Sequence, residues 1–150
     1  MALAQSTARL VAPVIRWLDS VSPLIDFTVR FWVANVFWKS GIAALHDWQS
    51  TLDLFTYEFK VPLLAPQAAA ILGTGVELFF PVLLVIGLAT RFSAASLFIF
   101  NIIAVISYPG LGEAGLKDHV YWGILLMVTL LHGPGKISLD HFIRRKWMKS

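Results

Sequence analysis

Apolar residues along this chain gather into four long runs that are separated by short polar stretches. The runs cover residues 24–45, 68–90, 92–109 and 116–133. Each is close to the roughly 20 residues that a helix needs to cross a bilayer. The last run is the weakest, because only Val120 to Leu131 is continuously apolar, and a shorter buried helix is the alternative there. The pattern predicts four transmembrane helices packed into a bundle.

Three further segments mix apolar and polar residues in a way that is typical of helices lying at a membrane surface. The first is the N-terminal stretch Ala8 to Val21, which carries Pro13 in its middle. The second is the long first loop, from His46 to Gln67. The third begins at Ser138, which can cap a helix after the Gly-Pro-Gly stop at 133–135. The apolar residues at helical spacing are Trp48, Leu52, Phe55 and Phe59 in the loop, and Leu139, Phe142, Ile143 and Trp147 near the C-terminus.

Composition supports a membrane protein and excludes several other classes. The 150 residues are 57% hydrophobic and 14% charged, with a mean hydropathy of +0.72, which is too apolar for a soluble domain of this size. The length fits one domain, residues 1–150. Because the sequence has no cysteine, disulfides, thiolate chemistry and iron–sulfur clusters are excluded within it. Redox chemistry would therefore need a bound cofactor or a partner protein.

Basic residues are distributed unevenly, and this distribution predicts the orientation in the membrane. Eight of the twelve Lys and Arg residues lie in the two tails and in the loop between the second and third runs. Positive residues are enriched on the cytoplasmic side of membrane proteins. We therefore expect a multi-pass protein of a bacterial inner membrane with both termini in the cytoplasm. The net charge of +3 is better explained by topology and anionic lipid than by nucleic acid.

Glu77 is the most informative polar residue, because it lies inside an apolar run where a charge is costly to bury. Such a carboxylate persists when it has a partner or a water-filled cavity, and Lys39 lies inside another run. Counting about 1.5 Å per residue places both side chains at a similar depth in the outer half of the bilayer. The two residues can therefore form a pair or line one cavity. Alternatively, Lys39 snorkels to the headgroups and Glu77 is a neutral acid.

Three more polar side chains are expected at the same depth, so that all four helices offer a polar group to one site. They are His119 and Tyr121 at the start of the fourth run and Tyr108 at the end of the third. We predict a ligand-binding site from Lys39, Glu77, His119, Tyr121 and Tyr108 in the outer half of the bundle, with no assigned catalytic residue.

Other polar residues receive structural interpretations. Asp26 and Arg30 have the favoured i,i+4 spacing and are predicted as a structural pair near the inner end of the first helix. Asn101 is expected to form an interhelical hydrogen bond. A metal held loosely by His46, Asp47, Asp118 and His119 is a minor alternative, and no metal site is predicted.

Three segments resemble the DoxX family of small four-helix membrane proteins. They are Phe31 to Gly41 (FWVANVFWKSG), Gly87 to Arg91 (GLATR) at the end of the Glu77 helix, and Gly133 to Asp140 (GPGKISLD). The resemblance implies an all-α integral membrane four-helix bundle. It also implies an association with membrane oxidoreductase systems, which include a thiosulfate:quinone oxidoreductase, and with stress-response operons.

Two classes of function follow. In the first, the chain is a membrane subunit of an oxidoreductase or stress-response system and binds a quinone or another small ligand in the polar site, without being a catalyst alone. In the second, it is a binding or transport module for a small molecule, peptide or metal complex, or a non-catalytic anchor for a soluble partner. We expect contact with the lipid bilayer and with a protein partner or further copies of the chain. No nucleic acid is expected.

Overall fold

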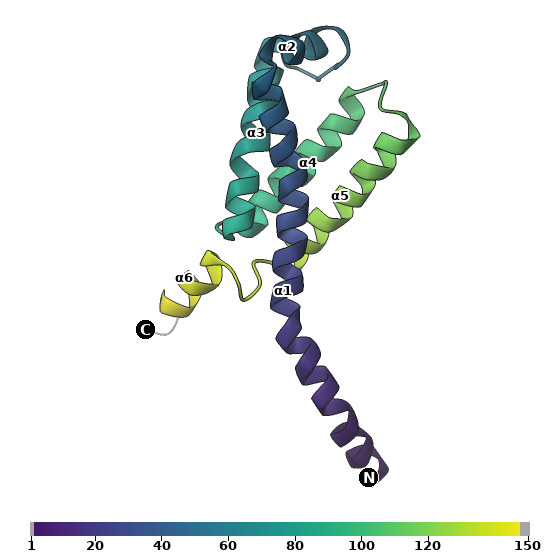
Figure 1. Ribbon diagram of the computed structural model, residues 1–150, viewed down its shortest axis with the longest axis vertical. Coiled ribbons are helices and arrows are strands. Elements are labelled where there is room, and N and C mark those ends of the chain that lie inside the picture. The colour runs from purple at the N-terminus through teal and green to yellow at the C-terminus, as the bar shows by residue number, and fades with distance from the viewer. Residues whose placement is uncertain (1, 148–150) are drawn as a thin grey trace.

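The computed structural model describes the backbone of residues 2–147 and the side chains of residues 11–147. The described residues form six helices and no strand, which confirms the all-α prediction (Figure 1). In chain order the helices are α1 (Ala2–His46), α2 (Trp48–Tyr57), α3 (Pro66–Ile86), α4 (Thr90–Ser107), α5 (Gly112–His132) and α6 (Leu139–Trp147). We call the end that carries α2 the outer end and the end that carries α6 the inner end.

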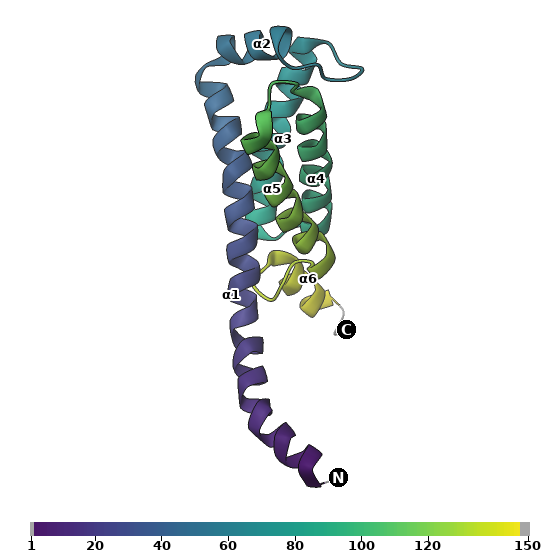
Figure 2. The same cartoon turned by 90° about the vertical axis from the view of Figure 1, so that its right-hand side faces the viewer.

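Helix α1 differs from the expectation at its N-terminal end. The stretch Ala8 to Val21 was expected as a separate interfacial helix, but it continues into the first apolar run as one helix of 45 residues. Pro13 and Pro23 lie inside it. An internal proline removes one backbone hydrogen bond and bends a helix, but the turns on both sides can keep their own bonds. At about 1.5 Å per residue, α1 is roughly twice as long as a bilayer core is thick, and its N-terminal part extends beyond the bundle (Figure 2).

Helices α1, α3, α4 and α5 pack around one shared core. Helix α1 packs mainly against α3, α4 packs against both α3 and α5, and α5 also contacts α1. Small residues such as Ala34 and Ala94 allow these close approaches. The buried core consists of Val33, Ala34, Phe37, Leu84, Ala94, Leu97 and Leu126.

Two of the four core helices, α3 and α4, are long and apolar enough to cross a membrane. Their most apolar stretches have mean hydropathies of 2.2 and 1.6, and only 28% and 33% of those stretches are buried. A core helix of a soluble protein would be mostly covered, so these values indicate helices that present apolar surface outward. Helix α3 ends at Ile86, four residues before the expected end of its run, because Gly87 adopts a left-handed conformation with φ of 75°.

The first loop contains the expected amphipathic helix, α2, which lies across the outer ends of α1 and α3 (Figure 1). Asp47 caps it by accepting hydrogen bonds from the Ser50 backbone N–H at 3.0 Å and the Ser50 hydroxyl at 2.7 Å. These bonds hold the pKa of the Asp47 carboxyl below its usual value. The Thr51 hydroxyl donates to the Ala44 carbonyl at 3.0 Å, which ties α2 to the end of α1.

At the inner end, Asp140 fastens α6 to the start of α4. Its carboxylate accepts hydrogen bonds from the Ala89 backbone N–H at 2.9 Å, the Thr90 backbone N–H at 2.8 Å and the Thr90 hydroxyl at 2.9 Å. Burial alone would raise the pKa of Asp140, but these bonds, with Arg144 nearby, hold the pKa below its ordinary value. The Asp140 N–H donates to the Gly87 carbonyl at 2.9 Å. Two of the segments that resemble the DoxX family therefore meet here.

Arg30 closes the same junction from α1. It is 1% exposed and donates to the carbonyl of Leu84 at 3.1 Å and to that of Ile137. Asp26, the partner predicted from the i,i+4 spacing, lies beside Gly135, and its carboxylate is beyond ion-pair distance of the Arg30 guanidinium. The hydrogen bonds of Arg30 go to the carbonyl groups of distant segments instead.

Candidate functional site

Asn101 of α4 and His119 of α5 form a reciprocal pair of hydrogen bonds. The Asn101 side-chain nitrogen donates to the His119 carbonyl at 2.9 Å. The Asn101 side-chain oxygen lies 2.8 Å from His119 Nδ1. Asn101 is 4% exposed, whereas His119 is half-buried. The sequence identified each residue separately, and the structure brings them together as an interhelical contact.

This geometry determines which ring nitrogen of His119 carries the proton. A backbone carbonyl can only accept, so the Asn101 atom that faces it must be the NH₂ group. The remaining Asn101 atom facing Nδ1 is then the acceptor oxygen, and Nδ1 must be the donor. In a neutral imidazole the other nitrogen, Nε2, is consequently an unprotonated acceptor. The pair therefore prepares His119 to accept a proton or a hydrogen bond at Nε2.

His119 and Asn101 line an open groove of about 390 Å³ between α4 and α5. The groove is otherwise apolar, and Gly123 contributes to its depth because a Cβ there would lie 3.5 Å from the Asn101 amide nitrogen. A ligand in this groove would contact hydrocarbon side chains along most of its length and one polar pair. The apolar lining includes Phe98, Ile102, Val105, Leu116, Val120 and Ile124.

Glu77 lies elsewhere, at the contact between α3 and α1. Its carboxylate lies near the Ser40 hydroxyl. Gly41 lets the helices approach, since a Cβ there would lie 3.0 Å from the Glu77 Cβ. The Lys39 side chain is exposed. Among the described residues, Glu113 and Lys117 form the one ion pair, with a distance of 3.8 Å. Lys39 and Glu77 are therefore too far apart to form an ion pair.

The two tyrosines also lie apart from the Asn101–His119 pair. Tyr108 follows the end of α4, where its ring packs against Phe59 with centroids 4.9 Å apart and its hydroxyl lies near Glu58. Tyr121 is 53% exposed on the surface of α5. The structure therefore divides the five predicted ligand-binding residues among separate places.

An aromatic cluster in the bundle core leads from α1 to His119. The Phe37 ring is buried in the core and contacts the rings of Phe100 and Trp122, with centroids 6.3 and 6.2 Å apart. Trp122 in turn contacts the His119 ring at 4.7 Å. Edge-to-face contacts of this kind fix the rings relative to one another. His119 is thus held on one side by Asn101 and on another by Trp122.

Metal-ligating side chains do not cluster in the described part of the chain. No three His, Asp or Glu residues between 11 and 147 come close enough to hold a metal ion. The alternative metal site considered from the sequence therefore does not form in the described residues. It comprised His46, Asp47, Asp118 and His119. The imidazole of His119 is engaged by Asn101 instead.

Comparisons with known proteins give a family and one relative. Residues 25–109, more than half of the chain, match the DoxX family. A protein of Haemophilus influenzae described as "Uncharacterized protein" is 31% identical over 134 residues, covering 81% of this chain and 87% of that protein. No solved structure matches the chain. The matched region contains Asn101, whereas His119 lies beyond it.

Proposed function

The chain belongs to the DoxX family, and on this premise we propose that it is a four-span membrane protein that binds the headgroup of a lipid-soluble quinone between α4 and α5. The observation that carries the proposal is the orientation of His119 by Asn101 in an apolar groove. A quinone combines an apolar tail with a ring whose carbonyl oxygens accept hydrogen bonds, and whose reduced form, the quinol, donates them through its hydroxyl groups. The groove offers matching apolar walls and one oriented imidazole.

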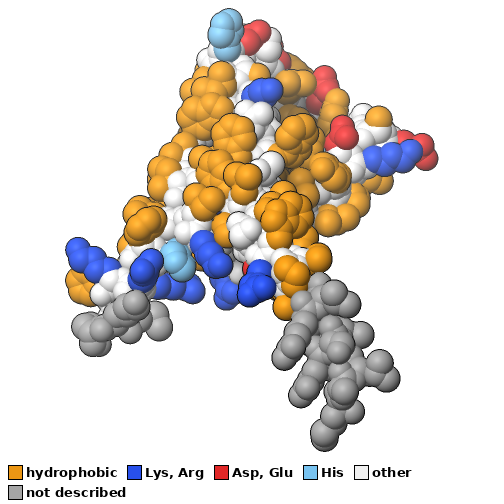
Figure 3. Space-filling model, turned by 60° about the horizontal axis from the view of Figure 1, so that its bottom comes forward, with side chains coloured by type: hydrophobic (Ala, Val, Ile, Leu, Met, Phe, Trp, Pro, Cys, Tyr) orange, Lys and Arg blue, Asp and Glu red, His pale blue; other side chains and the backbone are white. Residues whose placement is uncertain are grey.

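Charged residues in α1 and α5 are compatible with four spans. In α1, Arg30 is buried against carbonyl groups, and exposed Lys39 lies near the outer end, where its long stem can reach the headgroups. In α5 the three charged residues lie in the first two turns, and the 14 residues from 119 to 132 cover about 21 Å, so this helix spans the membrane with its charged start among the headgroups. Many Lys and Arg side chains gather at the inner end, which supports a cytoplasmic location for that end (Figure 3).

His119 supplies the proton chemistry in this proposal. When a quinol hydroxyl enters the groove, Nε2 accepts its hydrogen bond and can take up its proton, while Asn101 holds the ring through Nδ1. The imidazolium that results can donate to a quinone oxygen by the same atom. Asn101 thus positions His119 without contacting the ligand ring. Conversion of the quinol to the quinone releases two electrons and a second proton. The electrons pass to a redox centre of a partner protein in an oxidoreductase system and the second proton to water; this sequence has no cysteine for an iron–sulfur cluster of its own.

Glu77 and Lys39 do not contact the quinone in this proposal. Lys39 belongs to α1 and Glu77 to α3, and neither residue lines the groove between α4 and α5. Glu77 belongs to the α1–α3 contact, and exposed Lys39 reaches toward the headgroups. This assignment separates the proposal from one in which the two charges bind the ligand.

Thermal stabilisation by a short-chain quinol tests the proposal. A ligand that binds only the folded state raises the melting temperature as its concentration rises. We expect such a rise for the wild-type protein and for Tyr121→Phe, a control two residues away on the exposed surface. We expect no rise for His119→Phe, whose ring has no acceptor in the place of Nε2. An equal rise for His119→Phe, or none for the wild type, would remove the quinone site.

A further inference from the structure

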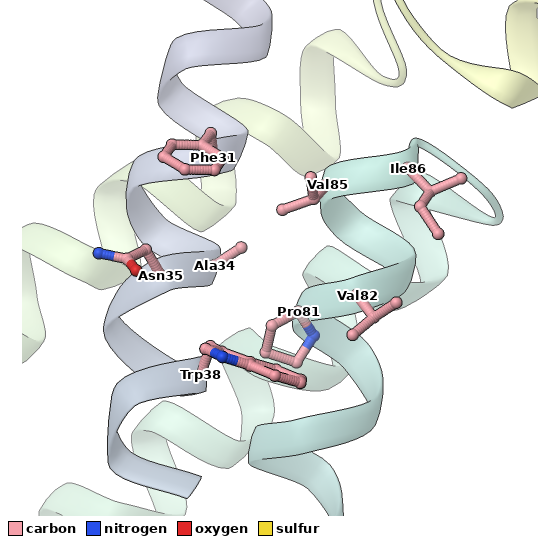
Figure 4. Close-up of a pocket in the computed structure, with 8 residues that line it drawn as sticks. All are labelled: Phe31, Ala34, Asn35, Trp38, Pro81, Val82, Val85 and Ile86. Carbon is pink, nitrogen blue, oxygen red and sulfur yellow. The ribbon is translucent and has the colours of Figure 1, made fainter. Parts of the chain in front are cut away.

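A second groove lies between α1 and α3 on a part of the surface that the quinone proposal does not use. It has a volume of about 240 Å³, and its lining is almost entirely apolar. In Figure 4 the Trp38 ring lies beside Pro81, and the walls continue along α3 as far as Ile86. Phe31 and Ile86 near the inner end are 51% and 50% exposed. The groove therefore opens to whatever surrounds the bundle.

The inner end of this groove lies next to the beginning of α6. Ile86 lines the groove, and the next residue, Gly87, accepts the Asp140 backbone hydrogen bond at 2.9 Å. The segment before α6 also contacts α1, because Arg30 donates to the Ile137 carbonyl. Figure 4 shows the yellow C-terminal segment beyond the Ile86 end of the groove.

Basic side chains lie in the C-terminal segment that meets this inner end. Lys136 lies between α5 and α6, and Arg144 and Arg145 lie on α6; all three are exposed. Two acids lie at the same end: Asp140, which is occupied by its three hydrogen bonds from Ala89 and Thr90, and Asp26, which lies beside Gly135. Both are partly buried whereas the three basic side chains are exposed, so the exposed charge of this end is mainly positive, and Figure 3 shows Lys and Arg side chains gathered there.

We propose that this groove and the basic residues beside it bind one anionic phospholipid. An acyl chain occupies the groove between α1 and α3, and the phosphate meets the basic residues of the segment 136–145. Charge complementarity selects the occupant. A purely apolar ligand would form no contact with the basic residues, and a free anion would form no contact with the apolar groove. The amphipathic helix α6, with exposed Phe142 at 67%, lies in the same interfacial layer as such a headgroup.

The test compares two lipids on the purified full-length protein in detergent. Melting temperatures are measured with phosphatidylglycerol, with phosphatidylcholine of the same acyl chains, and with inorganic phosphate alone. We expect the largest rise with phosphatidylglycerol, a smaller rise with phosphatidylcholine and none with phosphate. Equal rises with both lipids, or a rise with phosphate equal to that with phosphatidylglycerol, would overturn the proposal.

Two variants separate the groove from the basic residues. Val82→Trp fills the groove and should reduce the response to both lipids, whereas Ile99→Trp, on the exposed face of α4, should keep it. The double variant Lys136→Gln/Arg145→Gln should abolish the preference for the anionic lipid while its response to phosphatidylcholine remains. The matched control Lys60→Gln/Lys117→Gln removes two charges at the outer end and should keep the preference. If the outer control loses the preference and the inner double variant keeps it, the proposal is wrong.

Discussion

Replacing Asp140 by alanine should detach α6 from the bundle. The carboxylate accepts three hydrogen bonds at 2.8 to 2.9 Å from Ala89 and Thr90. Hydrogen bonds to a charged group contribute about 1.5–3 kcal/mol each when buried. Because Asp140 is only partly buried and water can reach the freed N–H groups, we discount the sum to about 2–4 kcal/mol of unfolding free energy. Asp140→Asn keeps one acceptor oxygen and should lose about half of that.

The pH dependence of this contribution gives an independent check. The pKa of Asp140 is held below its ordinary value in the folded protein. A depressed carboxyl pKa stabilises the folded state above the unfolded pKa of about 3.9, and this stabilisation is lost as the pH falls through the folded value. The difference in stability between wild type and Asp140→Asn should therefore be full at pH 7 and shrink below about pH 4.

The assay is unfolding in detergent monitored by circular dichroism, together with hydrogen exchange at the Ala89 and Thr90 amides. Both amides should exchange faster in Asp140→Ala than in the wild type, because they lose their acceptor. A loss below about 0.5 kcal/mol, the level of an ordinary surface substitution, would refute the reasoning. Unchanged exchange at the two amides would refute it as well.

Three further predictions concern the junction, the carboxylate and the topology. Gly87→Ala should lower the free energy of unfolding by at least about 2 kcal/mol, measured by thermal unfolding. An added Cβ at φ of 75° would lie 2.5 Å from the Arg30 guanidinium and 2.8 Å from the Ser138 backbone. Lys39→Met and Glu77→Gln should have additive effects on stability within about 0.5 kcal/mol, since the two residues form no ion pair; a larger coupling in a double-mutant cycle would contradict their separation. In cells, an impermeant thiol reagent applied from outside should label Asp53→Cys and leave Arg145→Cys unlabelled, and the reverse pattern would invert the proposed orientation.

Local features of the fold were predictable from sequence because their physical causes are local. The apolar spacing of Trp48, Leu52 and Phe55 predicted α2, and the glycine–proline–glycine stop before Ser138 predicted the start of α6. The Ser138 hydroxyl indeed accepts the His141 N–H at 3.1 Å. In each case the relevant interactions span a few residues, so the spacing along the chain contains the information.

The polar contacts were less predictable, because the position of a residue along a helix gives its depth in the membrane but not the direction in which its side chain points around the helix axis. Counting residues placed Lys39 and Glu77 at a similar depth, but the structure leaves Lys39 exposed and packs Glu77 against Gly41. Arg30 had an obvious local partner in Asp26, whereas one of its carbonyl partners lies 107 residues away. Contacts between residues this far apart in the chain depend on tertiary packing. The spacing of residues along one sequence does not reveal them.

The central claim is that Asn101 leaves Nε2 of His119 free to receive a quinol hydroxyl. Nitrogen-15 NMR of histidine-labelled protein in detergent tests it most directly, with His119→Gln used to assign the signal. Without ligand, the account predicts a neutral ring protonated at Nδ1, and addition of a short-chain quinol should shift the Nε2 resonance toward that of a hydrogen-bonded or protonated nitrogen. A ring protonated at Nε2 before addition, or an Nε2 resonance that a saturating quinol leaves unchanged, would contradict the account.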